Sequence, residues 1–325
     1  MDLMKIRKNH IHLFILLFAV SSLLVHSPPE AFADVGDITA VRSESLGNHF
    51  TMETTASWNS FVHVDEDTYA LAYLSQAGTG KGSISTFTIS SDGDTITELD
   101  TLQHTPSRGG YNSLVRVDSD TVALAFTGTD GNGFITTFTI DSNGNITKVD
   151  TLEHDTYQSA TSYNTLLHVN SDMYALAYDR SNTNLISTVT IDSDGNITAV
   201  KTQSEGNNLN LNNGAAQGHG SLVKVDSDTV ALAHSGTFDD GFITTFTIDS
   251  NGNITQVDTL EHDTTYGREN SLVQVDSDTY ALSYKGTGGG YISTVTIDSG
   301  GNITCLLYTS PSPRDLSTSR MPSSA

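Results

Sequence analysis

Hydrophobic and polar residues alternate along many short segments of this chain, with a period of two. In the segment 134–140, phenylalanine, threonine and isoleucine alternate so that methyl groups or rings fall on both faces of an extended strand. Threonine allows this because it offers a methyl group as well as a hydroxyl. The pattern predicts strands that are covered on both sides, and no segment shows a convincing helical period.

The alternating segments belong to a repeat with a period of about fifty residues. Each copy has four β-rich runs, separated by an Asp-Ser-Asp cluster, a glycine-rich loop and an Asp-Ser-x-Gly-Asn hairpin pattern. The repeat therefore predicts one four-stranded antiparallel sheet per copy. Five copies begin at Ser60, Ser113, Thr165, Ser221 and Ser271.

A short segment at 36–41 matches the fourth run of a later copy at 195–200, but no copy precedes it. We expect this lone strand to complete the last sheet, which would close a ring and remove open edges. The predicted fold is an all-β propeller of four-stranded antiparallel blades, five of them visible, in a natural chain that is longer. A linear array of sheets is the alternative. Over Val35–Thr304 the chain resembles secreted bacterial or archaeal β-propeller repeat proteins, a resemblance that implies a fold rather than an activity.

The first 33 residues have the three zones of a secretory signal peptide. Lys5, Arg7 and Lys8 precede an apolar run at 11–25, and Ala31-Phe32-Ala33 is a small-x-small cleavage motif. We expect cleavage, a propeller domain at 34–304 and a secreted, cell-surface or periplasmic location without membrane insertion. An uncleaved anchor helix is the alternative, although the run is short for a bilayer span.

The last 21 residues break the repeat. After Gly301-Asn302-Ile303-Thr304 the sequence turns to serine, proline and arginine, and 305–325 resembles translated sequencing adapter. We expect this tail to be a disordered artefact. The single cysteine, Cys305, lies in it, so residues 34–304 offer no disulfide, cysteine-bound zinc or thiol nucleophile.

The formal net charge of the chain is −23. Nucleic acid and anionic membranes require positive surface, so we expect neither as a partner. Neutral glycans, basic proteins and cations remain compatible, and solubility alone would also account for the acidity.

Ligand-binding candidates lie in or beside the loops that vary between copies, since recognition usually resides in variable loops on a rigid scaffold. For Tyr111 and Tyr163 the alternative is a cap on the core of the next sheet. For the histidines, which end the fourth run, the alternative is a solvated strand end. The predicted ligand-binding residues are Tyr111, Tyr157, Tyr163, Phe238, Tyr266, His154 and His262.

One hairpin resembles the start of a calcium loop, because Asp192, Asp194 and Asn196 place oxygens at alternate positions around Gly195. It lacks the downstream bidentate glutamate, and Asx-x-Asx-Gly is also ordinary hairpin chemistry. These residues are weak calcium candidates, and we expect no other cofactor.

The copies are too alike to suggest an asymmetric catalytic centre. Between 113–156 and 221–264, seven of the 44 aligned residues differ, and the differences are scattered. We predict an exported, non-catalytic binding, adhesion or interaction scaffold for an extracellular glycan or protein, with equivalent sites that gain by multivalency. The alternatives are a structural spacer in a larger surface protein and a propeller glycosidase or lyase; no catalytic residue is predicted.

Overall fold

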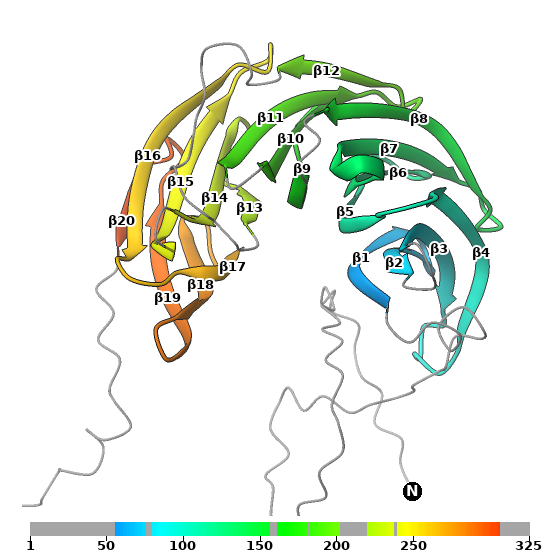
Figure 1. The fold of residues 1–325 in the computed structure, drawn as a ribbon, viewed down its shortest axis with the longest axis horizontal. Helices are drawn as coiled ribbons and strands as arrows, with labels where there is room; N and C mark the ends of the chain where they lie inside the picture. The colour runs from blue at the N-terminus through cyan, green and yellow to red at the C-terminus, as the bar shows by residue number, and fades with distance from the viewer. Residues whose placement is uncertain are drawn as a thin grey trace, which may run out of the picture. The chain divides into compact units, whose positions relative to one another are not determined.

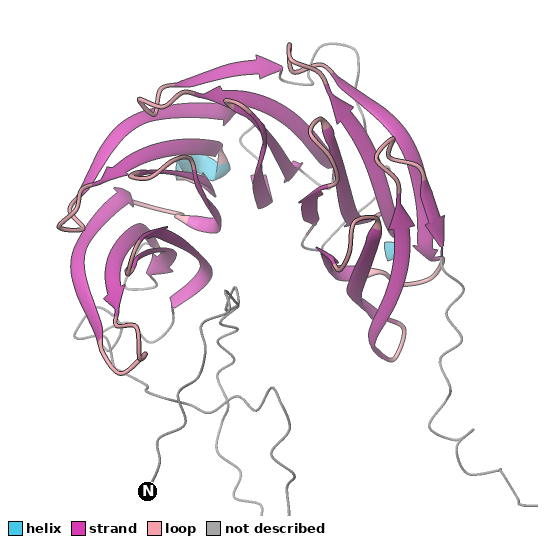
Figure 2. Cartoon of the chain, turned by 180° about the vertical axis from the view of Figure 1, so that it is seen from behind, coloured by secondary structure: helices cyan, strands magenta, loops and turns pink. Residues whose placement is uncertain are grey.

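The computed structural model describes residues 56–75, 80–156, 161–180, 183–201, 220–236 and 239–305. These belong to one compact unit, Val41–Ala325. They form five four-stranded antiparallel sheets, one for each copy of the repeat (Figure 1). Strands make up most of the described chain (Figure 2). No helix in these ranges is long and apolar enough to span a bilayer.

Within each sheet the strands follow one another in chain order. The first sheet contains β1 (Ala56–Asp65), β2 (Thr68–Ser75), β3 (Lys81–Ile89) and β4 (Ile96–Thr105). The second contains β5 (Gly110–Arg116), β6 (Thr121–Thr127), β7 (Gly133–Ile140) and β8 (Ile146–Asp155), with the short 3₁₀ helix η1 (Thr129–Gly131) between β6 and β7. The third contains β9 (Thr161–Asn170), β10 (Met173–Arg180), β11 (Thr183–Ile191) and β12 (Ile197–Lys201). The fourth contains β13 (Ser221–Lys224), β14 (Thr229–Ser235), β15 (Gly241–Ile248) and β16 (Ile254–Asp263). The fifth contains β17 (Arg268–Gln274), β18 (Thr279–Gly286), β19 (Gly289–Ile297) and β20 (Ile303–Cys305).

The hairpin between the third and fourth strands of a sheet is fixed by an aspartate and a glycine. In the second sheet Gly144 has φ +80° and donates its N–H to the carbonyl of Asp141 at 2.8 Å. The Asp141 carboxylate accepts the backbone N–H groups of Asn143 and Asn145, both at 2.9 Å. Glycine adopts this left-handed conformation without a steric penalty, which explains the recurring Asx-Gly pattern.

The apolar core lies between consecutive sheets rather than within any one of them. Each of the four junctions holds one cluster of buried side chains contributed by both neighbouring sheets. At the junction of the second and third sheets, Ala123, Ala125 and Ile135 pack against Tyr174 and Leu176. The small alanines permit close approach of the two sheets.

Hydrogen bonds also cross every junction. A buried threonine of one sheet donates its hydroxyl to the carbonyl of the hairpin glycine of the next sheet. The four bonds are Thr86–Gly144 (2.6 Å), Thr137–Gly195 (2.6 Å), Thr188–Gly252 (2.9 Å) and Thr245–Gly301 (2.6 Å). Buried polar groups must be paired in this way to avoid a desolvation cost.

The structure confirms the all-β class and the four-stranded antiparallel sheets. The fourth strand of the fifth sheet is β20, which pairs with β19 through Ile303 and Thr304. The predicted closing strand at 36–41, the signal peptide at 1–33 and the tail after Cys305 lie outside the described residues.

We predict that Thr137→Val will lower the free energy of unfolding by about 1–3 kcal/mol, because it leaves the buried Gly195 carbonyl without its donor. The matched control is Thr147→Val, since Thr147 is exposed and its replacement should change stability by less than about 0.5 kcal/mol. Urea unfolding followed by circular dichroism measures both. Equal stability of the two variants would contradict the role assigned to the junction hydrogen bond.

Candidate binding site

The variable loops and the starts of the first strands lie at the same end of each sheet. In the second sheet, Gly110 at the start of β5 pairs with Thr127 at the end of β6, and Thr127 pairs with Gly133 at the start of β7. Gly133 in turn pairs with Asp155 at the end of β8. The loop face, defined as this end of the sheets, therefore includes the residues that open β1, β5, β9 and β17.

A three-residue motif opens the first strand in four of the sheets. It consists of a large side chain, an asparagine and a serine or threonine: Trp58-Asn59-Ser60, Tyr111-Asn112-Ser113, Tyr163-Asn164-Thr165 and Glu269-Asn270-Ser271. The first residue of the motif has a left-handed backbone in each case, with φ of +59°, +53°, +55° and +54°. The strand pairing shifts register at the same point in all four sheets. Such bulges redirect a side chain, and a large residue with positive φ is uncommon.

The three aromatic residues at this position converge, although each comes from a different sheet. The ring centroids of Trp58 and Tyr111 are 3.9 Å apart, and those of Tyr111 and Tyr163 are 4.9 Å apart in an edge-to-face arrangement. Trp58 and Tyr163 are separated by 6.3 Å. All three side chains are partly exposed. We call Trp58, Tyr111 and Tyr163 the aromatic cluster.

The asparagines of the motif link the first strands of neighbouring sheets. Asn112 donates its side-chain N–H to the backbone carbonyl of Trp58 at 3.0 Å, and Asn164 donates to that of Tyr111 at 3.1 Å. Each bond therefore fixes the backbone carbonyl of the left-handed residue in the preceding sheet. The backbone of Trp58 and Tyr111, two of the three members of the aromatic cluster, is thus held by hydrogen bonds within the protein.

The Tyr111 hydroxyl remains protonated well above neutral pH. Burial raises its pKa, and the neighbouring Tyr163 and Asp179 raise it further. A neutral phenol can donate a hydrogen bond as well as accept one. The cluster thus combines aromatic faces with a polar hydroxyl.

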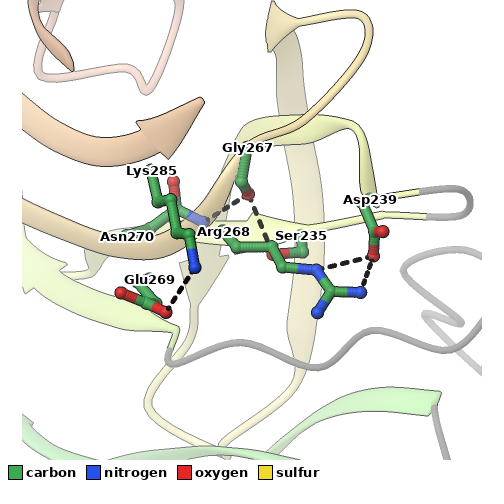
Figure 3. Close-up of polar contacts among 7 residues, drawn as sticks. All are labelled: Ser235, Asp239, Gly267, Arg268, Glu269, Asn270 and Lys285. Atoms are coloured by element: carbon green, nitrogen blue, oxygen red, sulfur yellow. Dashed lines mark hydrogen bonds and ion pairs between the residues drawn. The ribbon is translucent and has the colours of Figure 1, made fainter. Parts of the chain in front are cut away.

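In the fifth sheet, charged residues replace the ring at this position (Figure 3). Glu269 forms an ion pair with Lys285 at 3.6 Å. Arg268 contacts the Asp239 carboxylate through two nitrogens, with Nε at 2.8 Å from Oδ1. The Ser235 hydroxyl and the Asn270 amide both donate to the Gly267 carbonyl, at 2.8 and 3.0 Å. The backbone arrangement is therefore kept while the side-chain chemistry changes.

The structure brings together only some of the residues predicted from the sequence. Tyr111 and Tyr163 lie in the aromatic cluster, rather than in separate equivalent sites. Tyr266 lies beside Arg268, whose guanidinium carbon is 5.3 Å from the ring centroid. Tyr157 and Phe238 lie outside the described residues. Trp58 was missed, although its place before Asn59 and Ser60 repeats the pattern of Tyr111 and was a usable indication.

The candidate histidines are not on a solvated strand end. His154 is 7% exposed and His104, its equivalent in the first sheet, is 9% exposed. A side chain at Gly133 would overlap the His154 ring, since its Cβ would lie 2.3 Å from Cε1. The His154 ring stands edge-on to Tyr178 of the next sheet, with centroids 4.8 Å apart. It therefore fills a junction between sheets.

His262 occupies the same structural position in the fourth sheet but is less deeply buried. Its ring stands edge-on to Tyr284 of the fifth sheet at 4.5 Å, and it lies against Gly241. Within the described residues, no three histidine, cysteine, aspartate or glutamate side chains are placed to hold a metal ion.

The weak calcium candidates form a hairpin of their own. The Asp192 carboxylate accepts the N–H groups of Asp194 and Asn196 at 3.0 and 2.8 Å, and also the Asn196 side-chain amide. These hydrogen bonds lower the pKa of Asp192, the Asn196 side-chain bond most. The hairpin geometry accounts for these residues without a bound cation.

Comparison with known proteins supports the fold alone. No protein-family model matches the sequence, and no curated protein matches it. Among solved structures, a candidate 6-phosphogluconolactonase from Bacteroides fragilis aligns over 77% of this chain and 70% of its own, with 13% identity and a TM-score of 0.54. A second such protein from Bacteroides uniformis gives 16% identity, 74% and 82% coverage and a TM-score of 0.42. The SapL1 lectin, solved with alpha methyl fucoside, gives 12% identity, 76% and 78% coverage and a TM-score of 0.44. The similarity to the first of these shows a β-propeller fold.

The buried histidines predict a loss of stability in mild acid. Burial lowers the pKa of His104 and His154 to about 3, from 6.5 in an exposed histidine. The folded state therefore binds fewer protons than the unfolded state between pH 6.5 and 3. The free energy of unfolding therefore keeps its full value above pH 6.5. It decreases as the pH is lowered below 6.5, by up to about 1.4 kcal/mol per pH unit for each histidine.

His154→Leu removes one of these groups, so its unfolding free energy should depend less steeply on pH than that of the parent between pH 6.5 and 5. Urea unfolding at several pH values measures the two slopes. Identical slopes would contradict the lowered pKa, because they would show that His154 binds equally many protons in the folded and unfolded states.

Proposed function

We propose that this protein is an exported, non-catalytic glycan-binding protein, and that the aromatic cluster of the loop face is its binding site. The observation that carries this proposal is the convergence of Trp58, Tyr111 and Tyr163 on left-handed backbone. A large side chain at positive φ costs free energy, and such strain is concentrated at functional sites. Core packing alone does not require it, because the apolar clusters between sheets are built without these three residues.

Aromatic faces suit sugars because a pyranose ring presents a face of C–H groups that can stack on them. Binding pockets combine such apolar surface with a few placed polar groups that fix orientation. Here the Tyr111 hydroxyl, which hydrogen-bonds with Tyr163, supplies a polar group, and the asparagines hold the backbone of Trp58 and Tyr111 in position. Preorganised rings lose little conformational entropy when a ligand binds.

The negative net charge of the chain limits which glycans we expect as ligands. With a formal net charge of −23, the protein repels sulfated and other polyanionic sugars. We therefore propose a neutral glycan. Because three sheets contribute to one cluster, we expect one such ligand per chain at this place rather than one per repeat.

The full chain should bind neutral glycans on an array, and titration with the best of them should change the intrinsic fluorescence. The chain has one tryptophan, Trp58, so this fluorescence reports directly on the cluster. Tyr111→Ala should weaken binding at least tenfold, which corresponds to about 1.4 kcal/mol. The matched control is Tyr291→Ala, since Tyr291 is a 45% exposed aromatic residue in a different sheet.

Circular dichroism and thermal melting establish that both variants are folded. Unchanged affinity in Tyr111→Ala, or an equal loss in Tyr291→Ala, would refute the assignment of the site. Absence of binding to any glycan would refute the proposed function.

A further inference from the structure

Each of the four junctions between the described sheets has two unlike halves. The forward half of a sheet supplies small and β-branched residues and the threonine hydroxyl. The backward half of the following sheet supplies larger residues and the hairpin-glycine carbonyl. At the junction of the second and third sheets, Ile135 and Thr137 belong to the forward half, and Leu166 and Gly195 to the backward half.

The forward half of the fifth sheet is uncovered within the described residues. Ile292 is 64% exposed, whereas the equivalent residues of the other four sheets are fully buried: Ile84, Ile135, Ile186 and Ile243. Val273 of β17 and Val275, which directly follows that strand, are 50% and 64% exposed. A hollow of about 980 Å³ lies against this sheet, lined in part by Tyr284, Tyr291 and Ile292. We call Val273, Val275, Ile292 and Thr294 the open forward half.

The polar side chains on this face of the fifth sheet also lack partners within the described residues. Thr294 is equivalent to Thr245, which donates to the Gly301 carbonyl. Ser271 is equivalent to Ser221, which accepts the backbone N–H of Leu272 at 2.9 Å. No partner in the described chain stands opposite Thr294 or Ser271. The open forward half therefore offers the same donor and acceptor that complete the internal junctions.

The matching backward half is present on the same chain, in the first sheet. Phe61 is 44% exposed, while the equivalent Leu114, Leu166, Leu222 and Leu272 are at most 6% exposed. Gly93 closes the hairpin between β3 and β4 with φ +74° and donates to the Ser90 carbonyl at 2.8 Å. It thus corresponds to the hairpin glycines that accept a threonine hydroxyl at the internal junctions. We call Phe61 and Gly93 the open backward half.

We propose that the open forward half of one molecule binds the open backward half of a second copy of this chain. The contact continues the series of junctions from one molecule to the next, with Ile292 packed against Phe61 and the Thr294 hydroxyl on the Gly93 carbonyl. Such an interface is heterologous, because each copy contributes a different surface. It buries the exposed apolar residues that a monomer leaves in water.

The experiment uses the full chain and measures its mass against concentration by sedimentation. The parent should associate, with a mass that rises with concentration. Ile292→Lys breaks the forward half and should be monomeric, and Phe61→Lys breaks the backward half and should also be monomeric. The matched control is Val257→Lys, since Val257 is 38% exposed in β16 and belongs to neither half; it should associate like the parent.

An equimolar mixture of Ile292→Lys and Phe61→Lys separates this arrangement from any other. In the mixture, Phe61→Lys keeps an intact forward half and Ile292→Lys keeps an intact backward half. The two variants should therefore form a dimer and no larger assembly. A symmetric contact between two forward halves would instead leave Phe61→Lys associated by itself.

Circular dichroism and thermal melting ensure that the lysine variants are folded. A monomeric parent at all concentrations overturns the proposal. If Ile292→Lys then also melts at a lower temperature, a segment of the same chain outside the described residues covers the face. Because the readout is mass rather than glycan affinity, failure here leaves the proposed binding function untouched.

Discussion

The packing of one sheet on the next is the interaction on which the rest of this structure depends. No sheet buries a core by itself, since each of the four apolar clusters draws its members from two sheets. The buried threonine at each junction adds a directional bond to the next hairpin, which fixes how far one sheet slides along its neighbour. Repeat proteins in general gain stability from such nearest-neighbour interfaces. The positions of all other features follow from this one repeated contact.

Most of the fold could be predicted from the sequence because its determinants are local and recur. Strand propensity, two-residue alternation and the Asp-Ser-x-Gly-Asn hairpin specify each sheet without reference to distant residues. The alternation on both faces also indicated that sheets pack on sheets. These inferences needed no knowledge of how far apart the copies lie in space.

The candidate site could be predicted only in part because it depends on contacts between copies. Tyr111 and Tyr163 were chosen individually, and their separation of 52 residues along the sequence says nothing about their distance in space. Only the bulge at the start of the first strand turns the two rings toward each other and toward Trp58. His154 was placed on the surface because it ends a strand, but the register shift beside Gly133 directs its ring into the junction. The sequence did contain an indication of this packing. The first, second and fourth copies have a glycine before the third run and also a histidine at the end of the fourth run, whereas the third copy has Asn184 and Glu205 at these two positions.

The first residue of the Asn-containing motif is where the repeat is free to differ. The junction constrains the alanine, isoleucine and threonine positions, and these are nearly the same in every sheet. At the motif, by contrast, asparagine hydrogen bonds hold the backbone of Trp58 and Tyr111, and these bonds do not depend on the side chain of the residue that they hold. Tryptophan, tyrosine and glutamate occupy equivalent positions with nearly the same left-handed φ. Side-chain chemistry can change at these positions without a change in packing, and for this reason we propose the ligand site at the loop-face end of the first strands.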